Sequence, residues 1–446
     1  MVVIAGVVFS PIGHGLRVLL GRRRQMLAGR GIASPTAFAP PPMLEDHPSI
    51  AVLPFTNISD DREQEFLADG MTEDVITGLS LSRSLFVIAR NSTFSYKGKA
   101  PNIRDVGREM GVRYVLEGSV RRIGESLRVT AQLVDARNGV HVWAQALDRP
   151  LAEIFEIQDE ITAGIVAALT AHLTHAVTPE VARARPDSLD AWQLCHRARA
   201  HFLSNFDAAS RRTAEVLLRR AIRKDPKYAV AWVYLGCIVA WRWIVEPGTD
   251  ANENREEARY CIERGVSLAA GDPDVLAFQG NFAIITGQPR DAVPYLEQAL
   301  HLNPNEVVYR MFLARALAYV GRPAEALGEM EAVLRLSPRD PLAPNYAFQM
   351  AQIHFSLGSY AEAESWARRS LAGNARSSRV ALILGEALAA EGRVEEAHEA
   401  IREALRITPE ISLASQEYIL RNLGLDEALL ADRLRYLAIA WPLDLN

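Results

Sequence analysis

The sequence predicts two structural modules: an N-terminal α/β module with a mixed sheet, and an all-α superhelix of paired helices. Three observations carry this prediction. Between residues 49 and 175, apolar residues follow strand and helix periods in the order βαβαβββα. Within residues 187–410, glycine, alanine and proline recur at intervals of 34 residues. The chain has 446 residues, which is the length of two or three ordinary domains.

Residues 1–48 stand outside both modules. Their apolar run is interrupted by Pro11 and by polar residues, and three arginines, at 22–24, follow it. A membrane span needs about 20 consecutive apolar residues, and a secretory signal places its basic residues before the apolar run. We expect a leader and a Pro-rich linker, with a marginal membrane anchor in residues 1–24 as the alternative. The expected localisation is therefore either cytoplasmic or membrane-associated.

The first predicted strand and helix surround a cluster of acids. Residues 50–55 read as a buried strand, and Asp60 with Glu63 has the spacing of a capping box that opens a helix. The core-facing stripe of that helix recurs every four positions and consists of Leu67, Met71, Val75 and Leu79. A second stripe with the same spacing lies half a turn away and consists of Glu65, Asp69 and Glu73.

We interpret this acidic stripe as a solvent-exposed helix face. A catalytic carboxylate pair needs burial, or a partner that separates the two pKa values, and the face opposite a core stripe offers neither. The alternatives are docking of a basic partner and, less favoured by the pattern, a metal or acid/base site. With this interpretation, the first module is not expected to have catalytic activity of its own.

The rest of the first module alternates strands, turns and helices. A strand at 85–90 precedes a short helix that Asn102 opens and Gly111 ends. Three strands follow, at 112–122, 127–136 and 140–147, with turns at Gly124 and at Asn138-Gly139. A closing helix places one apolar face inward, formed by Ile154, Ile157, Ile161, Ile165, Leu169 and Leu173.

The first module resembles the TolB amino-terminal-like domain. The segments that carry the resemblance run in order through residues 49–172 and include "SIAVLPFTNIS", "EQEFLADGMTEDVITGLS", "DVGREMGVRYVLEGSVRR" and "VTAQLVDARNGVHVWAQALDR". In that family the domain occurs in bacterial signalling proteins together with tetratricopeptide repeats. It is often attached to an adenylate/guanylate cyclase domain or to a winged-helix DNA-binding domain. Residues 1–48 match neither of these output domains, and the resemblance implies no catalytic residues.

The second module resembles the tetratricopeptide repeat. Segments such as "GRPAEALGEMEAVLRLSP" and "GRVEEAHEAIREALRITP" combine a glycine turn, an amphipathic helix and a terminating proline. Phasing on the small residues and the proline of the family signature gives six repeats in 187–410, which begin near Cys195, Ala229, Pro273, Val307, Pro344 and Ser378. We expect residues 411–446 to form capping helices over the apolar face of the last repeat.

The resemblance also implies a partner-binding groove. In the family, the second, fifth, ninth, twelfth and thirteenth positions of each repeat line a concave surface. The residues that we expect to bind a partner there are Trp241, Asn281, Arg315, Tyr319, Asn345, Phe348, Gln352, Phe355 and Glu386. Amides among aromatic rings suit an extended peptide, because the amides bond its backbone and the rings hold its side chains. The alternative is that these residues form a hydrated concave surface that binds no partner.

The composition argues against other function classes. The net charge of −5 gives no global attraction to nucleic acid. Cys195, Cys237 and Cys261 are widely spaced and have no metal-ligand pattern, so we interpret them as small buried apolar residues. No Ser/His/Asp or Cys/His arrangement has supporting spacing. We expect neither a metal nor a cofactor.

The sequence therefore predicts a non-catalytic signalling or scaffold protein of bacterial type. Its partner is expected to be a protein or peptide held in the concave groove, and the sequence leaves the oligomeric state open. The alternative is the regulatory C-terminal half of an adenylate/guanylate cyclase or of a winged-helix transcriptional regulator, with its output domain elsewhere. An enzyme in its own right is the third hypothesis.

Overall fold

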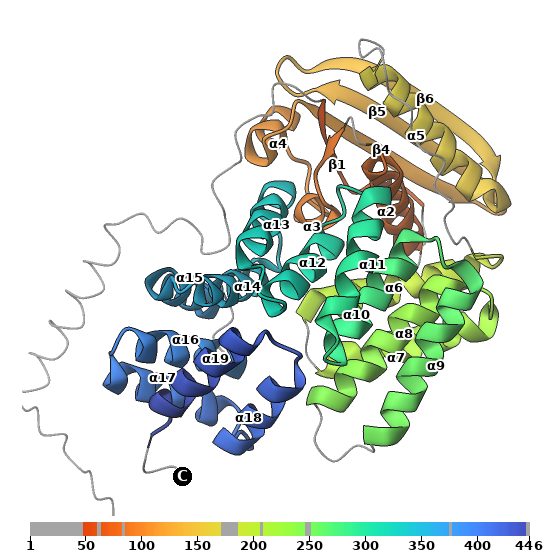
Figure 1. Ribbon diagram of the computed structural model, residues 1–446. Helices are drawn as coiled ribbons and strands as arrows, with labels where there is room; N and C mark the ends of the chain where they lie inside the picture. The colour runs from red at the N-terminus through yellow and green to blue at the C-terminus, as the bar shows by residue number, and fades with distance from the viewer. Residues whose placement is uncertain are drawn as a thin grey trace, which may run out of the picture.

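The computed structural model describes residues 48–59, 64–82, 85–170, 186–205, 208–245, 251–373 and 377–442. It confirms the predicted fold class, since a mixed-sheet module is followed by a curved series of helices (Figure 1). The predicted leader, the Asp60–Glu63 capping box and Leu173 lie outside the described residues.

The sheet of the first module is mixed, as predicted. Its strands are β1 (Ser49–Val52), β2 (Thr56–Asn57), β3 (Phe86–Val87), β4 (Tyr114–Ile123), β5 (Ser126–Asp135) and β6 (Val140–Pro150). The order is β3-β1-β4-β5-β6, with β2 beside β4. β1 runs parallel to β3 and β4, whereas β4, β5 and β6 are antiparallel. The tight turn into β6 uses Gly139 at φ 79°, as the Asn-Gly pair predicted.

Two predicted strands are shorter than expected. The strand at 50–55 ends at Val52, shortly before Pro54, whose nitrogen has no hydrogen to donate to a neighbouring strand. The next backbone N–H, that of Phe55, donates instead to Oγ1 of Thr72, 2.9 Å away. The strand at 85–90 is only β3, because a short helix begins at Arg90.

Helices cover both faces of the sheet. They are α2 (Glu65–Ser80), α3 (Arg90–Phe94), α4 (Ile103–Met110) and α5 (Ile154–Thr170), the last preceded by a 3-10 turn (Leu151–Glu153). α2 and α5 pack on one face around Leu116, Val129 and Ile161. α4 packs on the other, around Val115 and Met110. Asn102 caps α4 as predicted, with Oδ1 accepting from the Arg104 N–H at 2.9 Å.

Six helix pairs follow within the described residues. They are α6 (Leu189–Asn205) with α7 (Ala208–Lys224), α8 (Ala229–Val245) with α9 (Ala251–Ala269), α10 (Pro273–Ile285) with α11 (Pro289–Leu302), α12 (Val307–Tyr319) with α13 (Pro323–Leu336), α14 (Ala343–Ser356) with α15 (Tyr360–Gly373), and α16 (Ser378–Ala390) with α17 (Val394–Ile407). Small residues let the helices approach: a Cβ on Gly280 would lie 2.8 Å from Cγ of Leu296. The expected start of the first repeat near Cys195 is wrong, because α6 begins at Leu189.

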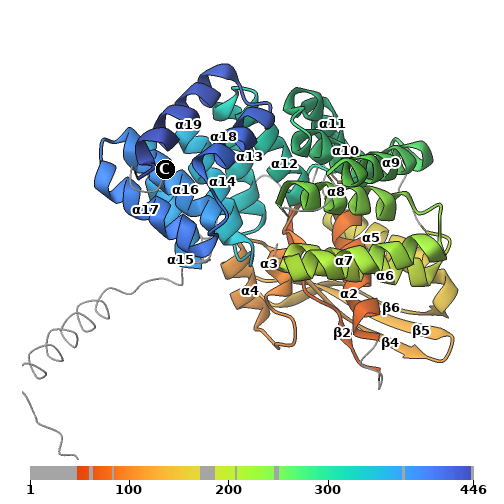
Figure 2. The ribbon, with the colours of Figure 1, turned by 90° about the horizontal axis from the view of Figure 1, so that it is seen from below.

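The two modules share a hydrophobic core. Trp192 of α6 is 2% exposed and belongs to the apolar cluster of the α/β module. Its indole lies directly over Gly70 of α2, where a Cβ would come within 2.4 Å of the ring. Its Nε1–H donates to Oδ2 of Asp74 at 3.0 Å. The first helix of the repeats therefore completes the core of the first module, and in Figure 2 α6 and α7 lie in front of α2.

The loops between repeats make further polar contacts with the first module. Asn305, in the loop before α12, donates through Nδ2 to the carbonyl oxygens of Ser80 at 3.2 Å and of Leu85 at 3.1 Å. At the end of α13, the Leu336 carbonyl accepts from the Ala89 N–H at 2.8 Å. Nearby, the Ser92 hydroxyl accepts from the Arg339 N–H at 2.9 Å. These bonds satisfy backbone groups at the ends of α2 and around β3 that would otherwise lack partners.

The interpretation of the acidic stripe as a solvent-exposed face is wrong at Glu73. Its carboxylate is buried between the modules, with its residue 3% exposed. It forms ion pairs with Arg199 of α6 at 2.8 Å and with Arg90 of α3 at 3.1 Å, and it lies 3.0 Å from Nδ1 of His196. We call these four residues the junction cluster. Two further stripe acids are paired as well, since Lys97 contacts Asp69 and Glu65.

The charges of the junction cluster hold one another ionised. Burial alone would raise the pKa of Glu73, but Arg199, Arg90 and His196 outweigh it and lower that pKa. Burial alone would lower the pKa of His196, but the carboxylates of Glu73 and Asp74 outweigh it and raise that pKa. The folded state therefore favours a protonated His196 next to an ionised Glu73.

We expect Trp192→Ala to destabilise the whole chain. The substitution leaves a cavity over Gly70 and removes the Asp74 bond, and losses of about 3–5 kcal/mol are typical of such truncations. Denaturant unfolding measures the effect. Trp232→Ala is the matched control, because Trp232 is only partly buried within the repeats and donates to the Pro226 carbonyl. An equal loss in both variants would contradict the shared core.

We also expect His196 to make stability depend on pH. Because its folded pKa is raised, its contribution is complete below the ordinary histidine pKa and is lost as the pH rises through the raised value. The free energy of unfolding of the wild-type chain, measured from about pH 5.5 to 9, should therefore exceed that of His196→Gln most at the acidic end. A difference that stays constant or grows with pH would show that the junction does not hold a protonated histidine.

Candidate protein-interaction site

The predicted groove residues lie on the first helices of successive repeats. Trp241 comes from α8, Asn281 from α10, Arg315 and Tyr319 from α12, and Glu386 from α16, while α14 carries Asn345, Phe348, Gln352 and Phe355. Trp241, Arg315, Asn345 and Gln352 are partly accessible. The other five are buried: Asn281, Tyr319, Phe348, Phe355 and Glu386.

The C-terminal helices explain part of this burial. They are α18 (Leu413–Asn422) and α19 (Glu427–Ala440), and α19 lies along α16 (Figure 1). Arg433 of α19 pairs with Glu386, with Nη2 2.9 Å from Oε1. The ring of Tyr436 stands edge-on to Phe355, with centroids 6.1 Å apart. Phe355 and Glu386 are thus covered by the chain's own C-terminal segment and do not line an open groove.

The same segment reaches back to earlier repeats. The Asp426 N–H donates to the Tyr319 carbonyl at 2.7 Å, and Gly424 lies against Gly287 in the turn between α10 and α11. The C-terminal helices, which we expected over the apolar face of the last repeat, therefore also contact earlier repeats. The segment from Asn422 to Ala440 contacts the third repeat at Gly287, the fourth at Tyr319, the fifth at Phe355 and the sixth at Glu386.

The wall that α19 leaves open is rich in arginine and aromatic side chains. Arg315 has its Cζ 5.9 Å from the ring centroid of Trp241 and 5.6 Å from that of Phe312. Arg379 of α16 approaches the same Trp241 ring at 5.7 Å and the Phe348 ring at 5.0 Å. Sequence reasoning missed Arg379. It stands at the second position of its repeat, one of the wall positions, so the positional rule would have found it.

The three cysteines are buried, as the sequence indicated. Burial raises the pKa of each thiol, of Cys195, Cys237 and Cys261, to about 12. Reactive cysteines need a low pKa and access to solvent, so these side chains act as apolar filling. Among the residues that the structure describes, no group of three His, Cys, Asp or Glu could hold a metal ion.

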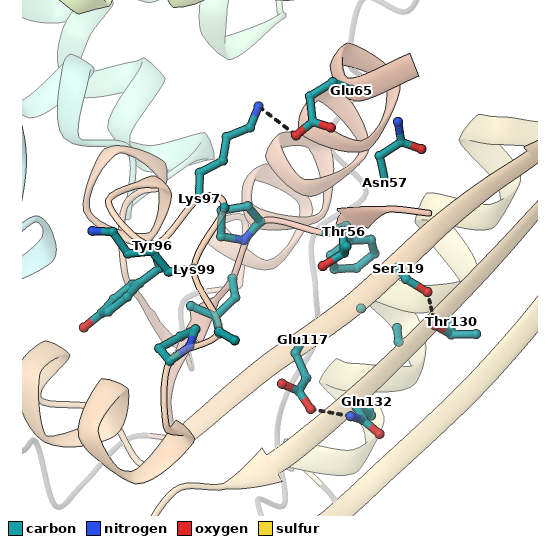
Figure 3. A pocket seen from close by; sticks show the side chains of 18 of the residues that line it. Thr56, Asn57, Glu65, Tyr96, Lys97, Lys99, Glu117, Ser119, Thr130 and Gln132 are labelled. Carbon is teal, nitrogen blue, oxygen red and sulfur yellow. Dashed lines mark hydrogen bonds and ion pairs between the residues drawn. The ribbon is translucent and has the colours of Figure 1, made fainter. Parts of the chain in front are cut away.

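A separate hollow of about 950 Å³ lies between the middle of strands β4, β5 and β6 and the segment that follows α3 (Figure 3). Its polar side chains bond mainly to one another or to nearby backbone. Ser119 and Thr130 are 2.8 Å apart, and Glu117 accepts from Gln132. Lys97 pairs with Glu65 at 3.3 Å, while Lys99 donates to the Ser95 carbonyl. The hollow has the character of a polar surface, and we assign no chemistry to it.

The membrane question concerns residues 1–24, which the structure does not describe. In the described part of the chain, no helix combines the length and the apolar character of a membrane span.

Comparison with known proteins identifies both modules. The family model "HilA/YgeH-like transcriptional regulator, second domain" matches residues 45–164. The tetratricopeptide repeat model matches residues 286–341, 313–378 and 348–410. A relative named "Putative adenylate cyclase 3", from Rhizobium meliloti (strain 1021), is 43% identical over 249 residues, which are 56% of this chain and 41% of that protein. The chain thus matches about two fifths of the length of this relative.

Two solved structures show weaker similarity. TolB from Acinetobacter baumannii is 21% identical with a TM-score of 0.23, over 29% of this chain and 30% of TolB. A thermophilic tetratricopeptide protein from Thermus thermophilus is 19% identical with a TM-score of 0.34, over 46% of this chain and 98% of that protein. From the family matches, the chain carries tetratricopeptide repeats, and its residues 45–164 are similar to the second domain of HilA/YgeH-like regulators.

Proposed function

We propose that this chain is a non-catalytic scaffold of bacterial signalling, which binds a segment of a partner protein on its concave wall. Tetratricopeptide repeats make protein–protein interaction its function class. The observation that supports this site is the open stretch of wall between Trp241 and Gln352. There, partly accessible side chains come from three helices: Trp241 from α8, Arg315 from α12, and Asn345 and Gln352 from α14. Such a mixture suits a peptide backbone with its side chains.

The α/β module serves in this proposal as the part that senses occupancy of the wall. It holds α6 through Trp192 and Arg199, and it holds the loop before α12 through Asn305. α12 also carries Arg315 of the wall. A partner that shifts α12 would therefore change the contacts between Asn305 and the α/β module, because α12 forms part of the wall and directly follows the loop that carries Asn305.

The second candidate function is regulation of a cyclase or of a transcription factor. Two observations favour it: the similarity of 249 residues to a protein named as an adenylate cyclase, and the match of residues 45–164 to a domain of transcriptional regulators. In this reading the concave wall has the same role, and the output domain lies in the same polypeptide or in a partner. Sequencing the coding region upstream of Met1 in the same frame discriminates between the two.

Partner capture tests the proposal. The full chain is used as bait in native cell extract, because α6 completes the core of the first module and the repeats should not be cut away from it. The triple variant Asn281→Ala, Arg315→Ala and Gln352→Ala should recover at least tenfold less partner than wild type. Arg406→Ala is the control, since Arg406 is exposed on α17 and pairs with Glu403. Equal recovery by the triple variant, with an unchanged melting temperature, would place binding elsewhere.

A further inference from the structure

Two arginines of the concave wall share one aromatic ring. Arg315 of α12 and Arg379 of α16 both have their Cζ atoms close to the Trp241 ring centroid, at 5.9 and 5.7 Å. Their helices belong to the fourth and sixth repeats, and Trp241 belongs to the second. The curvature of the superhelix therefore gathers three distant parts of the sequence at this point. We call Arg315 and Arg379 the arginine pair.

Among the residues that the structure describes, neither member of the arginine pair has an acidic partner. No carboxylate of this part of the chain lies within ion-pair distance of Arg315 or Arg379, whereas Arg310, Arg393 and Arg433 each have one. Arg315 donates to Oδ1 of Asn281, which is a neutral acceptor. Two like charges on one ring without a counter-charge are unfavourable for the free protein, since cation–π contacts offset only part of their repulsion.

Unused hydrogen-bond donors accompany these charges. Asn281 is 1% exposed and its side chain lies beside the Cys237 thiol; within the described ranges, neither its Nδ2 nor Nε of Arg315 has an oxygen acceptor. Buried polar groups are normally satisfied, so donors without such acceptors beside two cations point to an acceptor that binds there. Arg379 itself has accessible surface, which makes the pair reachable from the open side of the wall.

The surroundings also disfavour the charges electrostatically. Partial desolvation by neighbouring side chains lowers the pKa of Arg379, and the positive charges of Arg433 and Arg211 add to the effect, while Tyr319 opposes it. Burial likewise lowers the pKa of Arg315, with a further contribution from Arg379, again against Tyr319. An anion between the two guanidinium groups would relieve this repulsion, because charge-assisted bonds to arginine are among the strongest hydrogen bonds in proteins.

We propose that the arginine pair binds side-chain carboxylates of an acidic protein segment. This inference rests on the proposed function, and it specifies the chemistry of the partner. A protein segment is favoured over a small anion because the wall continues past the pair with Asn345 and Gln352, both partly accessible. The chain's own α19 already packs on this series of helices through an ion pair. In that pair the cation, Arg433, belongs to α19 and the carboxylate, Glu386, belongs to the wall, which is the opposite of the pairing that we propose for the arginine pair.

Binding of a defined probe tests the proposal. The probe is a fluorescein-labelled peptide of eight glutamates, and its counterpart has eight glutamines; fluorescence anisotropy with the full chain gives Kd at low and at moderate salt. The glutamate peptide should bind at least tenfold more tightly than the glutamine peptide, with an advantage that shrinks as salt increases. Arg379→Gln should weaken glutamate binding about tenfold, and Arg315→Gln likewise, whereas the control Arg406→Gln should not.

A second measurement separates binding from folding. Because Arg379→Gln removes unfavourable repulsion, its melting temperature should equal or exceed that of the wild type, so lost binding cannot be ascribed to unfolding. Equal binding of the two peptides, or glutamate binding unaffected by Arg379→Gln, would overturn the proposal. Competition by inorganic phosphate at concentrations similar to those of the peptide would also overturn it, in favour of a small-anion site.

The outcome can be separated from that of the proposed function. If wild type and Arg379→Gln recover the native partner equally, while the triple variant of Asn281, Arg315 and Gln352 does not, the concave wall remains the binding site and the acidic-segment inference fails. If none of these variants affects recovery, the proposed function fails as well.

Discussion

The fold of this chain depends on one buried carboxylate, that of Glu73. A carboxylate without partners cannot stay ionised inside a protein, and truncating one member of a buried ion pair typically costs about 3–5 kcal/mol. Glu73 comes from the α/β module, whereas two of its partners, His196 and Arg199, come from the first helix of the repeats. The junction is thus electrostatically complete only when both modules are folded and in register. Trp192, which packs against Gly70, adds an apolar contact that also requires both modules to be folded.

This arrangement gives the repeats two different surfaces. The α/β module covers one face of α6, along Trp192, His196 and Arg199, and it contacts the loops before α12 and after α13. The concave wall is bounded elsewhere by α19, which covers Phe355 and Glu386. Between them lies the stretch with Trp241, Arg315 and Arg379. Between the two modules, the carboxylate of Glu73 is thus surrounded by cations. On the wall where we propose that a partner binds, the arginine pair has no acidic partner among the described residues.

Much of the fold could be predicted, because its signals are local. The helix pairs follow from small residues and prolines at intervals of 34 residues, and the hairpin into β6 follows from Asn138-Gly139. The misreading of Glu73 has a different origin. A helix stripe shows which face is polar, but not whether another module covers that face. The reach of residues 423–426 to Gly287 and Tyr319, and the meeting of Arg315 with Arg379, likewise depend on superhelical curvature, for which the periodicity carries no information.

Calorimetry of the full chain tests most directly whether the junction makes one unit of two modules. If Glu73 and Trp192 join them as described, thermal unfolding at neutral pH and moderate salt should show a single transition, with van't Hoff and calorimetric enthalpies in close agreement. Two separate transitions, one of them matching the size of the α/β module, would contradict the account.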